Sequence, residues 1–319
     1  MSTILRATGN EEGKGAGAPV FSILIPSWNN LPFLRLCVES IERNSTFRHQ
    51  IIIHVNDGSD GTLEWVRGNG YDYTHTPCNA GVCLAMNMMR AKVATDYMLF
   101  LNDDMYVLPG WDKVLMEEIE RLPDNRFFLS ATTIQPHTAS GPVILADYGD
   151  TIESFREKEL LAEYMDYPMD DWMGATLPPN IVHRDIWDLV GGYSVEYSPG
   201  MYSDPDFTAK LWFCGIRYMR GLQASRVYHF ETKTTTRIRR NPGRRQFLLK
   251  WGMTSSTFRR LFTHRDEAWD PVLMDKVDRK ALGRDLVRSR LEAINALLTK
   301  KCFGPLWKFT HKNPPNEND

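Results

Sequence analysis

Four short apolar segments alternate with four segments of helical periodicity between residues 20 and 122. The apolar segments have the length of buried strands and lie at 20–26, 50–55, 71–75 and 97–101. The helical segments lie at 31–43, 63–67, 82–93 and 111–122. Pro26 should end the first strand, because proline cannot donate to a sheet ladder. This alternation predicts an α/β fold with a mostly parallel sheet and helices on both faces.

The remainder of the chain is less regular and ends in a basic region. We expect a helix at 206–214 and strands at 216–219 and 226–230. Residues 232–260 carry many Lys and Arg side chains and no acid. The segment 273–300 predicts an amphipathic helix, with apolar residues at Val287, Leu291, Ile294 and Leu298. Residues 1–18 are rich in Gly, Ala and charge, so we expect them to be disordered.

Composition excludes several classes of protein. Hydrophobic residues make up 42% and charged residues 24% of the 319 residues, as in ordinary globular proteins. A net charge of −2 argues against a general nucleic-acid binder. The five cysteines form no CxxC pair and suit a reducing compartment. With no signal-peptide pattern and no apolar run long enough to span a bilayer, we expect a cytoplasmic protein.

Two adjacent carboxylates and an amide follow the strand at 97–101, in the order Asn102, Asp103, Asp104. In open α/β sheets, ligands bind at the carboxyl ends of the strands. Carboxylates there are suited to a hard divalent cation that also takes phosphate ligands. The first hypothesis is therefore a site for a metal and a diphosphate.

Polar residues also follow the first three strands. A turn explains Gly58, Gly61 and Asp60, but not Asn56 and Asp57 at the end of a buried strand. An acceptor there could accept the hydrogen of a uracil- or thymine-type ring N–H, although Asp-rich turns also serve phosphotransferases. The segments 26–30 and 78–81 can equally be read as helix N-termini. The second of these could present backbone N–H groups to a phosphate.

Taken in order, these segments resemble the family 2 glycosyltransferases of GT-A fold. The resemblance covers about residues 20–230 and rests on six short segments, none specific alone. They are Pro26-Ser27-Trp28-Asn29, Asn56 to Thr62, Asn79-Ala80-Gly81 with Asn87, Phe100 to Asp104, Gly191-Gly192-Tyr193 with Ser203 to Phe207, and Val227 to Phe230. It implies a GT-A-type Rossmann-like mixed sheet flanked by helices, with a C-terminal helical extension.

The resemblance also assigns roles to residues. It implies that Asp104 and His229 bind a Mn²⁺ or Mg²⁺ ion on the diphosphate of a nucleotide-sugar. Asn102 departs from the usual first Asp of the metal-binding motif. A lone histidine at a strand end is otherwise more often structural. The residues implied to contact the nucleotide are Pro26, Ser27, Asn29, Asp57, Asn79, Asn102 and Asp103.

Asp204 falls at the position of the catalytic base in this family. Ser203 replaces the Glu that commonly precedes it. A structural alternative is that Asp204 caps a helix, with Pro205 at the first helical position and Asp206 at the second. Both roles are compatible, because a capping carboxylate still exposes its second oxygen.

The basic segment after Glu231 contains Pro242 and Gly243 and predicts a loop. Charge runs are usually solvated, but this run directly follows His229. We expect it to close over the diphosphate or to bind an acceptor, with Arg237, Arg244 and Arg245 as the candidate contacts. An alternative partner is an anionic membrane surface that carries a lipid-linked acceptor.

These observations predict three parts: a disordered N-terminus at 1–18, a glycosyltransferase domain at 19–230, and a basic loop with helical extension at 231–319. Within the domain we expect a nucleotide-binding half at about 19–125 and an acceptor half at about 126–230. The predicted activity is inverting, metal-dependent transfer from a nucleotide-sugar to a glycan or glycolipid hydroxyl. A UDP-sugar is favoured over dTDP- and GDP-sugars. The alternatives are a sugar-1-phosphate nucleotidyltransferase and a catalytically silent binding protein of the same fold.

Overall fold

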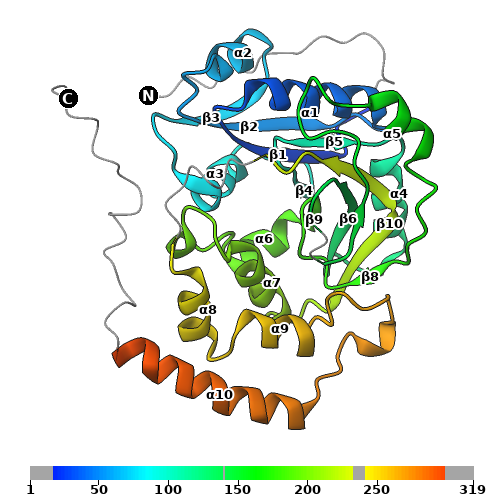
Figure 1. Cartoon of the computed structure of the whole chain (residues 1–319). Coiled ribbons are helices and arrows are strands. Elements are labelled where there is room, and N and C mark those ends of the chain that lie inside the picture. Colours follow the sequence, from blue (N-terminus) through cyan, green and yellow to red (C-terminus); the bar gives the residue numbers. More distant parts are fainter. Residues whose placement is uncertain (1–16, 139–140, 233–240, 299–319) are drawn as a thin grey trace, which may run out of the picture.

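The structure is a computed structural model that describes residues 17–138, 141–232 and 241–298 (Figure 1). In these residues ten strands form one sheet. The strands are β1 (Phe21–Trp28), β2 (Gln50–Asn56), β3 (Asp72–Thr76), β4 (Tyr97–Phe100), β5 (Met105–Val107), β6 (Phe127–Gln135), β7 (Val143–Leu145), β8 (Trp172–Met173), β9 (Asn180–His183) and β10 (Tyr218–His229). The helices are α1 (Leu31–Asn44), α2 (Thr62–Gly68), α3 (Gly81–Arg90), α4 (Trp111–Arg121), α5 (Glu157–Glu163), α6 (Arg184–Val190), α7 (Ser203–Phe213), α8 (Gly243–Trp251), α9 (Ser255–Leu261) and α10 (Arg279–Leu298).

The strand order is β3-β2-β1-β4-β9-β6-β10-β5, with β7 beside β6 and β8 beside β10. The first four strands are parallel, as the alternation predicts. Strand β9 then runs antiparallel to both β4 and β6, and β5 runs antiparallel to β10. The sheet is therefore mixed, and the predicted α/β class with a mixed sheet flanked by helices is confirmed.

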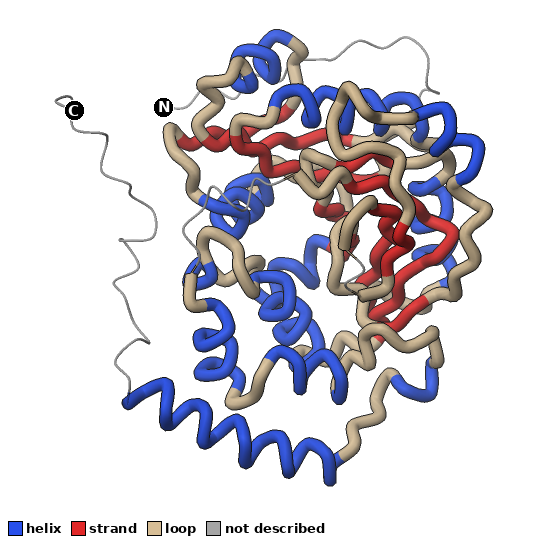
Figure 2. The backbone as a smooth tube through the Cα atoms, viewed as in Figure 1, coloured by secondary structure: helices blue, strands red, loops and turns tan. Residues whose placement is uncertain are grey.

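Both faces of the sheet are buried. Along β1, Ile23 and Ile25 belong to one apolar core, while Leu24 belongs to another on the opposite face. Helices α1 and α4 cover the first face, and α3, α6 and α7 cover the second. Figure 2 shows this second group of helices gathered on one side of the strands. Two covered faces explain why these strands read as continuous apolar runs rather than as alternating ones.

Two strand predictions are wrong in detail. Strand β1 does not end at Pro26 but continues to Trp28, with Pro26 paired to His54 of β2. Strand β4 pairs with β1 only as far as Leu24. On that side of β1, Pro26 has no partner strand, so its missing backbone N–H interrupts no hydrogen-bond ladder. The two expected strands at 216–219 and 226–230 are one strand, β10. Its register against β6 shifts between Leu222 and Arg226.

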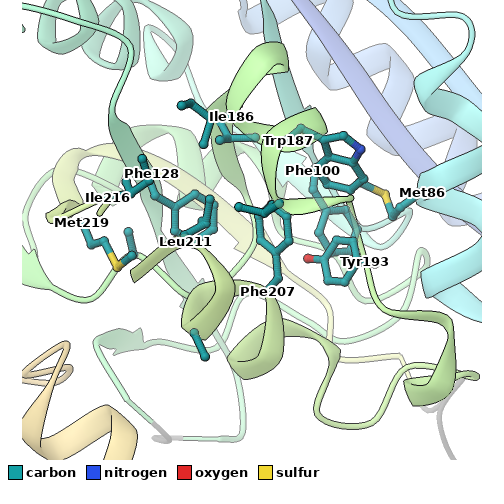
Figure 3. Close-up of a cluster of buried hydrophobic side chains, with 14 of the residues drawn as sticks. Met86, Phe100, Phe128, Ile186, Trp187, Tyr193, Phe207, Leu211, Ile216 and Met219 are labelled. Atoms are coloured by element: carbon teal, nitrogen blue, oxygen red, sulfur yellow. The ribbon is translucent and has the colours of Figure 1, made fainter. Parts of the chain in front are cut away.

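The C-terminal helices share the core of the sheet domain. Phe247 of α8 and Phe258 of α9 are buried in the same cluster as Phe207 and Leu211 of α7. Figure 3 shows Phe207 and Leu211 together with Trp187 in this cluster. The extension thus helps to fix α7, the helix that begins at Ser203. Across the part of the chain that the structure describes, no helix is long and apolar enough to cross a membrane.

Candidate active site

The carboxyl ends of β1, β2 and β4 meet at one edge of the sheet, as expected for parallel neighbours. Ser27 on β1 donates a hydrogen bond from Oγ to Oδ2 of Asp103 at 2.7 Å. Asn29, just after β1, donates from Nδ2 to Oδ2 of Asp57 at 3.1 Å. Four of the predicted nucleotide contacts are therefore joined in two hydrogen-bonded pairs across three strand ends.

Asn29 and Asp57 both have positive φ angles, of 47° and 66°. Such angles are costly for residues other than glycine and persist where the surroundings enforce them. Here Gly58 N donates to Asn29 Oδ1 at 2.9 Å, and Ser59 N donates to Asp57 Oδ1 at 3.2 Å. This network holds an amide and a carboxylate together beyond the ends of β1 and β2.

The other predicted nucleotide contacts have different surroundings. Pro26 lies inside β1. Asn79 accepts a hydrogen bond from Gly81 N at 2.9 Å and so shapes the start of α3. Asn56 also shapes the start of α3, because its Oδ1 accepts a hydrogen bond from Ala80 N at 2.8 Å. Asn102 is partly exposed at the end of β4. For all seven residues, contact with a nucleotide stays a prediction.

Asp104 and His229 lie together although they are 125 positions apart in the sequence. His229 pairs with Met105 across the β10–β5 ladder, and Phe230 N donates to the carbonyl of Asp104. The distance from His229 Nε2 to Asp104 Oδ1 is 3.3 Å. Burial raises the pKa of Asp104, but His229 and Thr232 outweigh this effect and the pKa is lowered overall. Burial lowers the pKa of His229, but Asp104 outweighs it and the pKa is raised.

Two further residues orient this pair, and the sequence analysis missed both. Thr232 donates to Asp104 Oδ2 from its backbone N at 2.9 Å and from Oγ1 at 2.7 Å. Gln135 on β6 lies with Oε1 3.4 Å from His229 Nδ1. An acceptor at Nδ1 favours a proton there, so Nε2, which faces Asp104, is the ring nitrogen that would bind a metal ion. No pattern in the sequence connects Gln135 with a strand end 94 residues later.

The donor atoms at this position fit a divalent metal ion. Asp104 Oδ1 and His229 Nε2 are oxygen and nitrogen ligands on adjacent positions, and their other atoms are engaged elsewhere. Among the described residues, no group of three or more His, Cys, Asp or Glu side chains could hold a metal. A metal here would therefore need further ligands from phosphate or water, as Mg²⁺ commonly does in phosphate sites.

Asp204 does not cap its helix. Helix α7 begins at Ser203 with Tyr202 as N-cap, so Asp204 is the second helical residue. The predicted capping role is therefore wrong, and so is the placement of Pro205 at the first helical position. The helix begins earlier because Tyr202 adopts a positive φ of 72° that reverses the chain there. Asp204 is partly exposed as a residue, and the helix start has no side-chain capping hydrogen bond.

Tyr193 holds the carboxylate of Asp204. Its hydroxyl donates to Asp204 Oδ1 at 3.0 Å. Asn87 of α3 fixes Tyr193 in turn, by accepting from Tyr193 N at 2.9 Å and donating to Tyr193 O at 2.8 Å. Tyr193 also packs edge-on against Phe100, the last residue of β4. Burial raises the pKa of Asp204 to about 6, although the Tyr193 hydrogen bond and the charge of Arg265 oppose the rise.

Asp206, the neighbouring carboxylate, has a different role. Its side chain is fully buried and accepts from Ser194 Oγ at 2.6 Å and from Trp251 Nε1 at 2.8 Å. Lys250 Nζ lies 2.9 Å from Asp206 Oδ1. These contacts join α7 to α8 and leave Asp206 engaged on both oxygens. Of the two carboxylates, only Asp204 has an oxygen to which no described residue donates a hydrogen bond.

The prediction of a loop at the basic segment is wrong for two of its three arginines. Arg244 and Arg245 lie in helix α8, which begins at Gly243. Arg244 is exposed and has Nη2 3.8 Å from Glu292 Oε2 of α10. Arg237 lies outside the described residues. Contact between these three arginines and a diphosphate or acceptor stays a prediction.

A family comparison bears on this edge of the sheet. The sequence model described as Glycosyl transferase family 2 matches residues 22–164, from β1 to just past α5. Over these residues the chain is similar to the family 2 glycosyltransferases. This confirms the resemblance inferred from the motifs. The matched stretch includes Asp57 and Asp104, whereas Asp204 and His229 lie beyond it.

Several known proteins are similar to this chain. Residues 1–349 of TarS from S. aureus superpose with a TM-score of 0.51 at 13% identity, over 90% of this chain and 77% of that chain. GalNAc-T7, solved with UDP, GalNAc and Mn²⁺, gives a TM-score of 0.49 at 14% identity, over 70% of this chain and 44% of that one. At such identities the TarS likeness shows a shared GT-A-type fold. An uncharacterized protein of Sinorhizobium fredii, y4gI, is 24% identical over 242 residues, which are 68% of this chain and only a quarter of that relative's length.

Proposed function

We propose that this domain is an inverting, metal-dependent glycosyltransferase that transfers a sugar from a nucleoside diphosphate to a hydroxyl of a glycan or lipid-linked acceptor. The observation that carries the proposal is the carboxylate of Asp204. One of its oxygens is held by Tyr193, and no described residue donates a hydrogen bond to the other. A carboxylate with a pKa of about 6 is a better general base near neutral pH than an ordinary aspartate.

In the proposed reaction, Asp204 accepts the proton of the acceptor hydroxyl. The hydroxyl oxygen forms a bond to the anomeric carbon while the bond from that carbon to the diphosphate breaks. A single displacement of this kind inverts the anomeric carbon and needs one base but no nucleophilic carboxylate. The engagement of Asp206 with Lys250, Trp251 and Ser194 favours this over a mechanism that uses two carboxylates.

The donor would lie across the carboxyl ends of β1, β2 and β4. We assign recognition of the base to Asp57 and Asn29, and uracil is the favoured base because a carboxylate can accept from its ring N–H. Ser27 and Asp103 lie between this position and Asp104. A Mn²⁺ or Mg²⁺ ion held by Asp104 and His229 would supply Lewis-acid stabilisation of the diphosphate. Thr232 and Gln135 keep both ligands oriented before any ion binds.

The proposal is tested by incubating the protein with UDP-, dTDP- and GDP-sugars and measuring nucleotide release, with and without Mn²⁺. We expect slow release from a UDP-sugar that requires the metal, since water can replace the acceptor. Nucleotide binding without release under any condition would favour the silent binding protein. Formation of a nucleotide-sugar from a nucleoside triphosphate and a sugar 1-phosphate would favour the nucleotidyltransferase.

Tyr193 should act as a positioning residue for Asp204. In Tyr193→Phe the carboxylate loses a hydrogen bond that lowers its pKa, so the pKa should rise further above about 6. Activity requires the ionised base, so the acid limb of the profile of kcat/KM against pH should move to higher pH. Donor KM should change little. Tyr148→Phe removes a buried hydroxyl that bonds Glu163 and Tyr167 in another cluster, and its acid limb should stay in place. An unmoved limb in Tyr193→Phe would contradict this role.

A further inference from the structure

Helix α10 lies along an outer edge of the molecule, below α8 and α9 in Figure 1. Its inner face is packed. Ala281 and Ser289 are buried, and Leu282 and Leu286 pack against the core cluster that contains α8 and α9. Asp285 accepts hydrogen bonds from Thr257 Oγ1 at 2.8 Å and from Arg260 Nη2 at 2.7 Å. The helix is therefore fixed to the protein by this face.

The opposite face of α10 carries a stripe of uncovered apolar side chains. Each is more than half exposed, and they recur every three or four residues: Val287, Leu291, Ile294 and Leu297. Other exposed large apolar side chains of the described chain are scattered over different elements. Single exposed apolar residues are ordinary, whereas a contiguous exposed stripe indicates a surface that binds something.

Cationic side chains flank this stripe. Lys280, Arg284 and Arg290 are exposed, and within the described chain no acid forms an ion pair with them, although the charge of Asp278 before the helix attracts Lys280 and Arg284. The two acids of the helix are satisfied elsewhere. Asp285 contacts α9, and Glu292 lies 3.2 Å from Arg288 and 3.8 Å from Arg244. The outer face of α10 is thus apolar and positively charged, although the whole chain has a net charge of −2.

This combination decides between two occupants. A second copy of the chain, docked through the same face, would bring the unpaired cations of both copies together. In an anionic bilayer, the apolar side chains of the stripe can be buried at the boundary of headgroups and acyl chains, while the flanking cations contact anionic lipid headgroups. We propose that α10 lies in the interface of an anionic membrane, parallel to its surface. At 20 residues the helix is about 30 Å long.

The test is co-sedimentation of the full chain with vesicles of phosphatidylcholine, alone or mixed with phosphatidylglycerol. We expect binding to the mixed vesicles that weakens strongly as ionic strength rises. Leu291→Glu with Ile294→Glu should lower the partition coefficient at least about tenfold, since both apolar contacts are lost. Arg284→Glu with Arg290→Glu should lower binding to mixed vesicles by about fivefold or more per residue. Leu189→Glu, equally exposed but on α6, is the matched control and should bind as the unaltered chain does.

Three results would overturn the proposal. The first is unchanged vesicle binding in the Leu291→Glu, Ile294→Glu variant with an unchanged melting temperature. The second is a dimer in light scattering that this variant converts to a monomer, which would assign the stripe to a second copy. The third is loss of binding on removal of residues 299–319 while the α10 variants bind normally. The Arg284→Glu, Arg290→Glu variant controls for misfolding, because both substituted side chains are exposed and the fold does not depend on them. None of these results depends on whether the domain transfers sugars.

Discussion

Replacement of Asp204 by Asn should lower kcat at least about 100-fold with little change in donor binding. Asn keeps the shape of the side chain and can still accept the hydrogen bond from Tyr193, but it cannot take a proton. The substitution should not lower the stability of the fold. Burial disfavours the ionised carboxylate and raises the pKa of Asp204 in the folded state to about 6. The stability that protonated Asp204 adds is therefore fully present only below the ordinary pKa of an aspartate, and it is lost as pH rises through about 6. At pH 8 the melting temperature of Asp204→Asn should therefore be equal or higher.

Asp206→Asn is the matched control, two residues along the same helix. Its carboxylate is buried against Lys250, Trp251 and Ser194, so the substitution should lower the free energy of unfolding by about 1–3 kcal/mol. Its kcat should fall far less than that of Asp204→Asn. The measurements are steady-state kinetics and thermal unfolding of both variants. If Asp206→Asn loses turnover while Asp204→Asn keeps it, the assignment of the base is wrong.

Replacement of Asp104 by Asn should weaken UDP binding at least about tenfold in the presence of Mn²⁺ and hardly at all in EDTA. The reason is that Asn removes the anionic ligand but can still accept hydrogen bonds from Thr232. Turnover should fall together with UDP binding, because the diphosphate would lose the positive charge of the metal ion. Isothermal titration in the two buffers provides the comparison.

The chain contains a second buried Asp–His pair for comparison. His49 Nε2 lies 3.0 Å from Asp112 Oδ2, and Asp112 also accepts from the backbone N of Thr46 and Phe47. This pair joins α4 to the segment before β2 and lies away from the strand ends that form the proposed site. Asp112→Asn should lower stability but leave the effect of Mn²⁺ on UDP binding intact. Equal losses with and without Mn²⁺ in Asp104→Asn would contradict the metal assignment.

The sequence was most informative where local chemistry fixes the structure. Strand ends rich in Asn and Asp predicted correctly that Asp57 and Asp103 would lie at one edge of the sheet, since parallel neighbours end on the same side. The juxtaposition of Asp104 with His229 came only from the family resemblance. It arises because β10 pairs with β5 across more than 100 residues of chain, and such a pairing has no local signal.

The errors have local physical causes. Pro205 indicated a helix start at Asp204, but the positive φ of Tyr202 moves the start back to Ser203. Pro242 and Gly243 indicated a loop, but Pro242 instead precedes α8 as its N-cap. Gln135 and Tyr193 act through other residues, Gln135 on His229 and Tyr193 on Asp204. Positioning roles of this kind depend on tertiary contacts, so sequence spacing could not have identified them.

We propose that the edge formed by β1, β2 and β4 holds a nucleoside diphosphate and a metal ion beside Asp104. The most direct test is a crystal of the protein grown with UDP and Mn²⁺, with anomalous data collected at the manganese edge. We predict an anomalous peak in contact with Asp104 Oδ1 and His229 Nε2, bridged to the diphosphate, with the uracil ring against Asp57. A manganese peak or a nucleotide bound elsewhere, with these side chains unligated, would contradict the account.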